Sequence, residues 1–249
     1  MTEIIRSEGI VLRRRDFGET SRIAVVYTRV SGKIQLHARG ARATRNKFGA
    51  ALEPLTRAEY VFYWRENKEL FTLSETAVIA SGQPLREEPA RLPYGLAMAE
   101  AADRLSAEGD PDGEFYDALA AALTALATGP PPILLAQLLI RFADRLGLAP
   151  NLAMCAACGR EDFTAGAWFD LADGTVSCRD CRRPGAPTLE VPPTVLALFG
   201  ALARFDPGQV DRIKTAPDTA ALALGLVRSH LHFRTGLELK SLALVGSCT

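Results

Sequence analysis

Four cysteines stand in two closely spaced pairs in the second half of the chain. Cys155 and Cys158 form one CxxC pair, Cys178 and Cys181 form another, and 19 residues separate the two pairs. Thiolates at this spacing are typical of a tetrahedral zinc site. Because four sulfur ligands leave no open coordination position, the spacing predicts one structural Zn²⁺ per chain rather than a catalytic ion.

Two other uses of these cysteines stay open at this point. Four cysteines can also hold an iron–sulfur cluster, and a single CxxC pair can carry out thiol redox chemistry. Between the pairs, the segment AWFDLADGTVSC is expected to form two short strands joined at Asp173–Gly174, which favours a metal site over a redox pair. We therefore expect a four-cysteine zinc ribbon at about 152–184, in which the metal staples a segment too poor in apolar residues to fold alone.

Other signs of catalysis are weak. His230 and His232 are two residues apart in a predicted helix, so they lie on different faces and cannot act as a pair of ligands. The chain has no GxSxG, Walker A or GxGxxG stretch, so no nucleotide cofactor is expected. A protein that is not an enzyme is the favoured class, and the alternative is a zinc-dependent or thiol-redox enzyme acting on nucleic acid or a small substrate.

Charge is distributed unevenly along a chain whose net charge is zero. Residues 1–82 contain 14 Lys and Arg against 9 Asp and Glu, whereas residues 83–150 contain 5 against 10. No acid occurs from Thr20 to Leu52, although seven bases do. Such a localised positive field indicates a polyanionic partner.

The spacing of apolar residues changes along the chain, from the alternation of strands to the three- and four-residue spacing of helices. Five short segments, at 9–15, 21–28, 32–40, 58–64 and 69–79, are rich in β-branched and aromatic residues and predict strands. In GKIQLHARG, Ile34, Leu36 and Ala38 share one face, and Lys33, Gln35, His37 and Arg39 share the other. Five strands in this length match an OB-fold β-barrel, which presents strands 2–3 and two loops to oligonucleotides.

Helical periodicity dominates after the barrel. Segments at about 92–109, 113–129, 132–147, 192–205 and 219–233 have apolar residues at three- and four-residue spacing. Two apolar stripes are expected to face a common core: Ala118, Leu119, Ala122, Leu123 and Leu126, and Leu135, Leu138, Leu139 and Phe142. The predicted fold is α+β and multidomain, with an OB-fold DNA-binding domain at 1–82 and a helical bundle at 83–249 that carries the zinc ribbon.

The location of the protein follows from what the sequence lacks. MTEIIRSEGIV carries an early acid and no long apolar run, so no signal peptide is expected. No stretch reaches about 18 uninterrupted apolar residues, the length that a membrane span needs. Cysteines in CxxC pairs suit a reducing compartment, so we expect a cytoplasmic protein. Cys248, which belongs to neither pair, is expected to be a terminal thiol without a role.

The segment HARGARATRNKFGAALEP carries the strongest signal for a binding surface. Its bases are spaced by small residues and glycines, so they can lie along a phosphate backbone without obstruction. Aromatic residues nearby could stack on bases, and only those on the Arg39 face are realistic candidates, one or two in number. The aromatic set is Phe17, Tyr27, Phe48, Tyr60 and Tyr63.

The stretch GIVLRRRDFGETSRIAVVYTRVSGKIQLHARGARATRNKFGAALEP resembles the N-terminal domain of the RecO family of bacterial DNA repair and recombination proteins. The DFGE turn, the SGK turn and the ARGAR segment before a basic loop carry the resemblance, and CAACG…CRDC is similar to the family's zinc ribbon. Family members commonly have lysine where Arg39 stands, which keeps the charge. The resemblance implies a protein that binds single- and double-stranded DNA and anneals complementary strands. With RecR, it would load RecA onto strands covered by single-stranded-DNA-binding protein.

Charge and resemblance together place DNA contact between Lys33 and Lys47 and at the end of the first strand, on a protein associated with the nucleoid. The candidate DNA-binding residues are Lys33, His37, Arg39, Arg42, Arg45, Lys47, Arg13 and Arg14.

Overall fold

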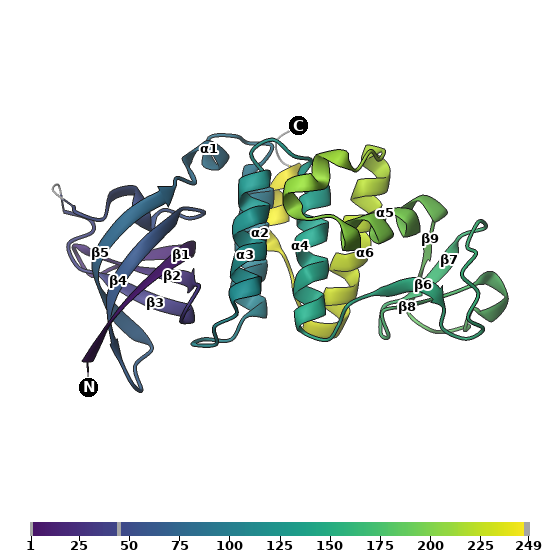
Figure 1. Cartoon of the computed structure of the whole chain (residues 1–249), viewed down its shortest axis with the longest axis horizontal. Coiled ribbons are helices and arrows are strands. Elements are labelled where there is room, and N and C mark those ends of the chain that lie inside the picture. Colours follow the sequence, from purple (N-terminus) through teal and green to yellow (C-terminus); the bar gives the residue numbers. More distant parts are fainter. Residues whose placement is uncertain (1, 44–45, 247–249) are drawn as a thin grey trace. The chain divides into compact units, whose positions relative to one another are not determined.

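The computed structural model describes residues 2–43 and 46–246, and its α-helices and strands are labelled in Figure 1. The chain forms two compact units, Met1–Ala127 with Leu239–Thr249, and Thr128–Glu238. The first unit therefore contains helices as well as strands, and the domain boundary expected after residue 82 stays a prediction. In the described ranges, no helix combines the length and apolar character that a membrane crossing requires.

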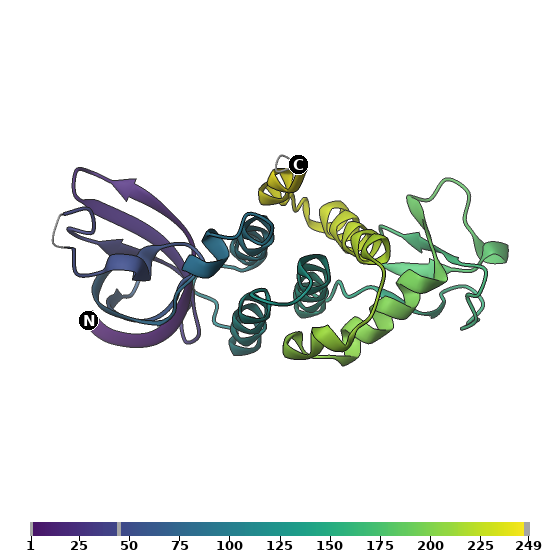
Figure 2. The same ribbon diagram turned by 90° about the horizontal axis from the view of Figure 1, so that it is seen from above.

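Five strands close into a barrel in the order β1-β2-β3-β5-β4. They are β1 (Thr2–Phe17), β2 (Ser21–Thr28), β3 (Gly32–Ala38), β4 (Arg57–Arg65) and β5 (Leu70–Ala80). Strand β1 serves both edges of the closure, because its first half pairs with β4 and its second half pairs with β2, with an irregularity between Val11 and Arg13. Strands β3 and β5 run parallel, and the curvature of the strands is visible in Figure 2. The expected OB-fold barrel is confirmed.

The barrel interior follows the predicted alternation of β3. Ile34, Leu36 and Ala38 are buried in the same core as Tyr60 and Phe62 of β4. The hydroxyl of Tyr60 donates a hydrogen bond to the carbonyl of Ala51, in the short helix η1 (Gly49–Leu52), at 2.7 Å. Burial raises the pKa of Tyr60 well above its ordinary value, so this hydroxyl stays protonated and tethers η1 to the barrel.

Helices of the same unit cover part of the outer barrel surface. Helix α2 (Leu92–Leu105) packs on β1 and β2, and Phe115 of α3 (Gly113–Ala125) lies 4.9 Å from the ring of Tyr27. The outward residues Ile23, Val25 and Tyr27 of β2 are therefore buried, although they point away from the barrel core. The short helices α1 (Gln83–Arg86) and η4 (Lys240–Gly246) also contact α2.

The second unit contains three of the predicted helices: α4 (Pro131–Arg145), α5 (Pro193–Arg204) and α6 (Pro217–Thr235), with η3 (Pro207–Arg212) between the last two. Each of the three begins with proline, whose missing N–H costs nothing in the first turn. The stripe of Leu135, Leu138, Leu139 and Phe142 on α4 is buried, and so is the stripe on α3 in the first unit. The residues of both stripes are thus buried, and their expected meeting in one common core stays a prediction.

The cysteine region forms a four-stranded sheet in the order β6-β8-β7-β9. Its elements are β6 (Asn151–Cys155), β7 (Ala167–Asp170), β8 (Thr175–Ser177), η2 (Arg179–Cys181) and β9 (Thr188–Val191). Strands β7 and β8 are antiparallel, which confirms the predicted hairpin. The ribbon extends beyond residue 184, because β9 pairs with β7 at its edge. A four-residue strand that follows a Pro- and Gly-containing stretch carries little signal in the sequence.

His230 of α6 anchors this ribbon. Its Nδ1 lies 2.9 Å from the carbonyl oxygen of Leu171, and its Nε2 lies 2.9 Å from that of Leu148. Gly174 has φ +68°, and a Cβ there would lie 2.8 Å from the imidazole, so the ring needs a glycine beside it. His232 instead has its Nδ1 3.2 Å from the carbonyl of Leu237, so the two histidines serve separate contacts.

Candidate nucleic-acid interface and metal centre

The four cysteines converge although 19 residues separate their pairs. One sulfur from each of Cys155, Cys158, Cys178 and Cys181 lies within 4.8 Å of all the others. The sulfurs of Cys158 and Cys178 are 3.9 Å apart. A tetrahedral zinc ion with bonds of about 2.3 Å holds its sulfurs roughly 3.8 Å apart, whereas a disulfide joins them at about 2.05 Å. The spacing fits ligands of one metal ion.

The backbone prepares the site for thiolates. Burial raises the pKa of Cys155, but N–H groups of Cys178, Cys158 and Ala157 outweigh it and bring that pKa to about 6. The pKa of Cys181 is raised to about 12, because its proton is held by hydrogen bonds to the sulfurs of Cys178 and Cys158. Cys155 therefore loses its proton readily, whereas Cys181 holds its proton. Deprotonation of all four cysteines calls for a bound cation.

Two contacts support the metal site from outside. Strand β6 ends at Cys155, and the N–H of Cys178 donates to the sulfur of Cys155 at 3.4 Å, so the two CxxC turns touch directly. Arg160 and Asp180, one from each turn, form an ion pair at 3.0 Å on the surface. Four sulfurs around one ion form a closed shell, and this arrangement can hold chain segments together but offers no position to a substrate.

Lys33 lies on the predicted polar face of β3, but that end of the face is covered. Its Nζ donates to the carbonyl oxygen of Asp103 and lies 3.6 Å from the carboxylate of the same residue. The side chains of Lys33 and Asp103 are only 12% and 18% exposed. The N–H of Gly109 bonds to the carbonyl of Lys33, and a Cβ on Gly32 would lie 2.2 Å from the backbone of Asp110. The Lys33 side chain is therefore largely covered by the segment around Asp103–Asp110, and its assignment to DNA contact stays a prediction.

Arginines of the first two strands are also paired with acids of the helices. Arg13 donates to the carboxylate of Asp103 at 2.5 Å, so α2 holds both Arg13 and Lys33 through one side chain. Arg29, which directly follows β2, makes a two-pronged contact with Asp117 of α3 at 2.8 and 2.9 Å. Part of the positive charge of residues 1–82 is thus neutralised by the acidic segment that follows it.

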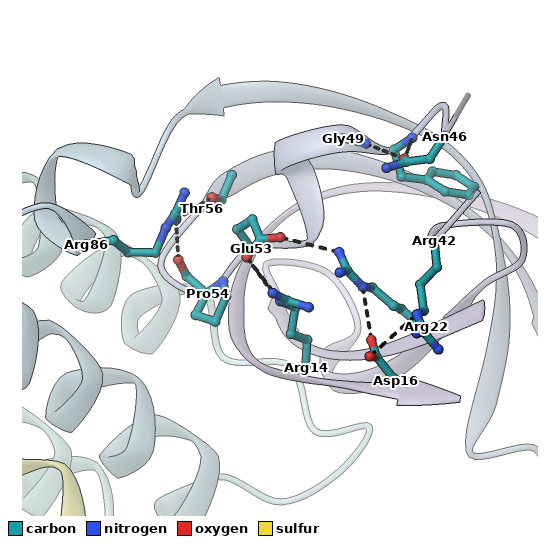
Figure 3. A network of polar contacts seen from close by, with 11 residues as sticks. Arg14, Asp16, Arg22, Arg42, Asn46, Gly49, Glu53, Pro54, Thr56 and Arg86 are labelled. Carbon is teal, nitrogen blue, oxygen red and sulfur yellow. Dashed lines mark hydrogen bonds and ion pairs between the residues drawn. The ribbon is translucent and has the colours of Figure 1, made fainter. Parts of the chain in front are cut away.

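A second network ties the basic loop to the barrel (Figure 3). Glu53 accepts from Arg14 at 3.0 Å and from Arg22 at 3.4 Å, and Asp16 lies between Arg22 at 3.2 Å and Arg42 at 3.5 Å. Two acids therefore engage three arginines. Arg14 and Arg42 therefore mainly hold the segment between β3 and β4 against the barrel, and they add only part of their charge to an outward positive field.

The remaining candidates, Lys47, Arg45 and Arg39, differ in whether their side chains already have partners in the barrel. Lys47 donates to the carbonyl of Ser74 on β5 at 2.9 Å, and its ammonium lies 5.1 Å from the ring centre of Phe48. Arg45 lies outside the described residues. Arg39 is exposed and has no ion pair in the described part of the chain. Arg39 is the candidate that the structure leaves most available.

Outward side chains form a continuous row across four strands on the open side of the barrel. His37 of β3 is paired in register with Thr72 of β5, Thr72 with Tyr63 of β4, and Tyr63 with Ile4 of β1. Phe17 extends the row at the other end, with its ring 5.4 Å from His37. The row runs from Phe17, beside the β1–β2 turn, through Tyr63, two residues before the end of β4, to Ile4 of β1. The β1–β2 and β4–β5 turns are the two loops through which OB-fold barrels bind oligonucleotides.

His37 lies between Thr72 and Phe17 in this row and has a ring nitrogen that is unpaired within the described part of the chain. Its Nε2 is buried and has no hydrogen-bond partner among the described residues. Burial lowers the pKa of His37, and the positive charge of Arg39 lowers it further, so the imidazole is neutral near pH 7. Because Nε2 is buried, it is not exposed to a ligand that lies across the row.

Beside the row, the barrel surface is hollowed to about 470 Å³. Three cations line this hollow: Arg39 at the end of β3, Arg65 at the end of β4, and Lys68 in the β4–β5 turn. Arg65 and Lys68 were absent from the sequence-based candidates, because Glu66 and Glu69 beside them conceal the local charge. The position of Lys68 in the turn between the fourth and fifth strands is the signal that could have identified it.

Aromatic residues sort cleanly between core and surface. Tyr27, Phe48 and Tyr60 are buried, whereas Phe17 is 43% exposed and Tyr63 is 40% exposed. Two of the five are therefore accessible for stacking, and both belong to the row that contains His37.

Comparison with known proteins covers the same two regions. Residues 1–81 match the family described as Recombination protein O N terminal, and residues 86–243 match Recombination protein O C terminal. A DNA repair protein RecO from Streptomyces coelicolor is 36% identical over 252 residues, which is 97% of this chain and 98% of the relative. Similar proteins of that name come from Streptomyces avermitilis (35% over 253 residues; 97% and 98%) and from Anaeromyxobacter sp. strain K (34% over 215 residues; 86% and 83%).

Proposed function

Because this chain belongs to the RecO family of DNA repair proteins, we propose that it is a non-enzymatic DNA-binding protein of recombinational repair. It binds single- and double-stranded DNA and anneals complementary strands. With RecR, it helps to load RecA onto single strands covered by single-stranded-DNA-binding protein. It acts in the cytoplasm, at the nucleoid.

The open side of the barrel is the observation that supports this proposal most. Helices α2 and α3 bury the outward face of β2, so DNA meets the barrel on β3, β5, β4 and the first half of β1. Arg39, Arg65 and Lys68 provide cations there without a competing acid among the residues lining the hollow. Contacts of this kind bind phosphates of any sequence, which suits a protein that handles strands generally.

Annealing follows from the same surface. Two complementary strands repel each other through their phosphates, and cations that neutralise them lower the barrier to pairing. Exposed Phe17 and Tyr63 hold single strands in an open form by stacking, which keeps the bases unfolded until a complement arrives.

We propose that the four cysteines hold one Zn²⁺ with a structural role. Sulfur ligands at the observed spacing suit a single ion, and iron–sulfur clusters spread their cysteines around several irons. Zinc content of one ion per chain, with thiols unreactive while the metal is bound, distinguishes this role from the thiol-redox alternative.

DNA titration at several salt concentrations tests the proposed surface. The double variant Arg39→Gln/Lys68→Gln should weaken binding to single strands and duplex alike, and slow annealing of labelled complementary strands. The slope of log affinity against log salt should flatten by roughly one to two units, since each lost phosphate contact removes most of one released counterion.

The matched control is Arg212→Gln/Lys214→Gln, which removes two exposed cations from the second unit. This control should bind and anneal like the parent. If the Arg39/Lys68 variant binds normally while removal of Arg182, Arg183 and Arg228 abolishes binding, the DNA path lies on the second unit and the proposal for the barrel fails.

A further inference from the structure

The hollow beside the β4–β5 turn combines charge with an exposed ring. Tyr63 and Leu70 are exposed within it, and Arg39, Arg65 and Lys68 surround them. Phosphate binding alone needs cations, so the apolar groups call for a ligand that also presents a flat apolar surface. A nucleotide has both parts.

The strand that carries Tyr63 is held on both sides. The register partners of Tyr63 are Ile4 and Thr72, and the next residue, Trp64, is stacked on Phe71 at 4.3 Å between ring centres. The backbone of the strand is thereby fixed, and it presents the Tyr63 ring on the outer face. Arg65 is steadied by a hydrogen bond from its Nε to the hydroxyl of Thr2 at 2.9 Å.

We propose that this hollow is a subsite for one unstacked nucleotide of a single strand, with its base on Tyr63 and Leu70 and its flanking phosphates at Arg39, Arg65 and Lys68. The inference rests on the DNA-binding function proposed above and adds a strand preference to it. In a duplex the base faces are covered by neighbouring pairs, so the ring of Tyr63 has nothing to stack on. The subsite therefore discriminates single strands from duplex, which the cations by themselves cannot do.

Substitution of the ring tests the subsite. Tyr63→Leu keeps an apolar side chain and removes no charge, so the salt slope for single strands should stay as in the parent. The ratio of single-strand to duplex affinity, measured with one oligonucleotide and its duplex at fixed salt, should fall by about 5- to 100-fold. Tyr63→Phe should restore the ratio, because the ring and not the hydroxyl makes the contact.

A short strand built only of abasic residues provides an independent measurement. The parent should bind this strand more weakly than a normal strand of the same length, and the difference between the two strands should be smaller in Tyr63→Leu than in the parent. Phe233→Leu is the matched control, since Phe233 is an exposed ring in the second unit. It should leave the single-strand to duplex ratio unchanged.

The outcomes separate this inference from the general function. A parent that binds no DNA at all overturns the proposed function and the subsite together. A parent that binds DNA, with a ratio that Tyr63→Leu does not alter, overturns the subsite alone. The subsite is also overturned if an acidic peptide binds in the hollow and strand binding is unaffected, because the hollow then belongs to a peptide partner.

Discussion

Lys33 of strand β3 and Asp103 of helix α2 form a largely buried ion pair, with 3.6 Å between Nζ and the carboxylate. Their positions are 70 residues apart in the chain. Arg13 shares the same carboxylate, so Asp103 is the acid that fastens α2 to two strands of the barrel. A cation that looks available for DNA is thus part of the packing of the first unit.

Charge reversal at Lys33 should destabilise the protein. Lys33→Glu places a carboxylate beside Asp103 and near Glu108, and the loss of a partly buried pair costs on the order of 3 kcal/mol. Urea unfolding should show this loss in the free energy of unfolding. Lys33→Met, which keeps the apolar stem, should cost less, and a fully stable Lys33→Glu protein would show that the pair contributes nothing.

Removal of the acid at Glu53 should release positive charge on the barrel. Glu53→Gln keeps the shape of the side chain but leaves Arg14 and Arg22 with less compensation. We expect a loss of about 1–2 kcal/mol in unfolding free energy and tighter DNA binding at low salt, with a steeper salt dependence. Glu190→Gln is the control, because it removes an exposed acid from the second unit. Unchanged affinity in Glu53→Gln would mean that Arg14 and Arg22 do not reach DNA.

Disruption of the cysteine cluster should affect the ribbon and spare the barrel. Cys178→Ser removes a buried ligand, so zinc content should fall and the ribbon should become protease-sensitive, while the thermal transition of the barrel persists. Zinc should also be lost from the parent as pH falls, because protons compete for the thiolates. Metal analysis by mass spectrometry checks both, and full zinc retention in a Cys178/Cys181 double variant would contradict the ligand assignment.

Truncation of Leu139 on α4 should be costly. Its side chain is fully buried, and Leu139→Ala leaves a cavity as well as losing apolar contact, for a loss of about 2–5 kcal/mol. Leu222→Ala on α6 is the control, because that leucine is 55% exposed and should cost little. Chemical denaturation compares the two, and equal small effects would place the α4 stripe on the surface.

Local patterns determined much of this structure from the sequence alone. Alternation over seven residues identifies the inward face of β3, because successive side chains of a strand point to opposite faces. Helical spacing located α2 to α6, and the CxxC spacing identified four cysteines whose sulfurs do meet. Strand β9 was not predicted, because a four-residue segment has little strand signal of its own and becomes a strand by pairing with β7.

The availability of the cations was decided by the tertiary structure. In the sequence, the excess of bases before residue 82 and of acids after it reads as two separate fields. In the fold, Lys33, Arg13 and Arg29 are paired with Asp103 and Asp117, whereas Arg39, Arg65 and Lys68 remain around one hollow. Ion pairs form between residues some 70 to 90 positions apart, and Coulomb attraction depends on distance in space rather than along the chain. No reading of local composition could therefore tell the paired cations from the free ones.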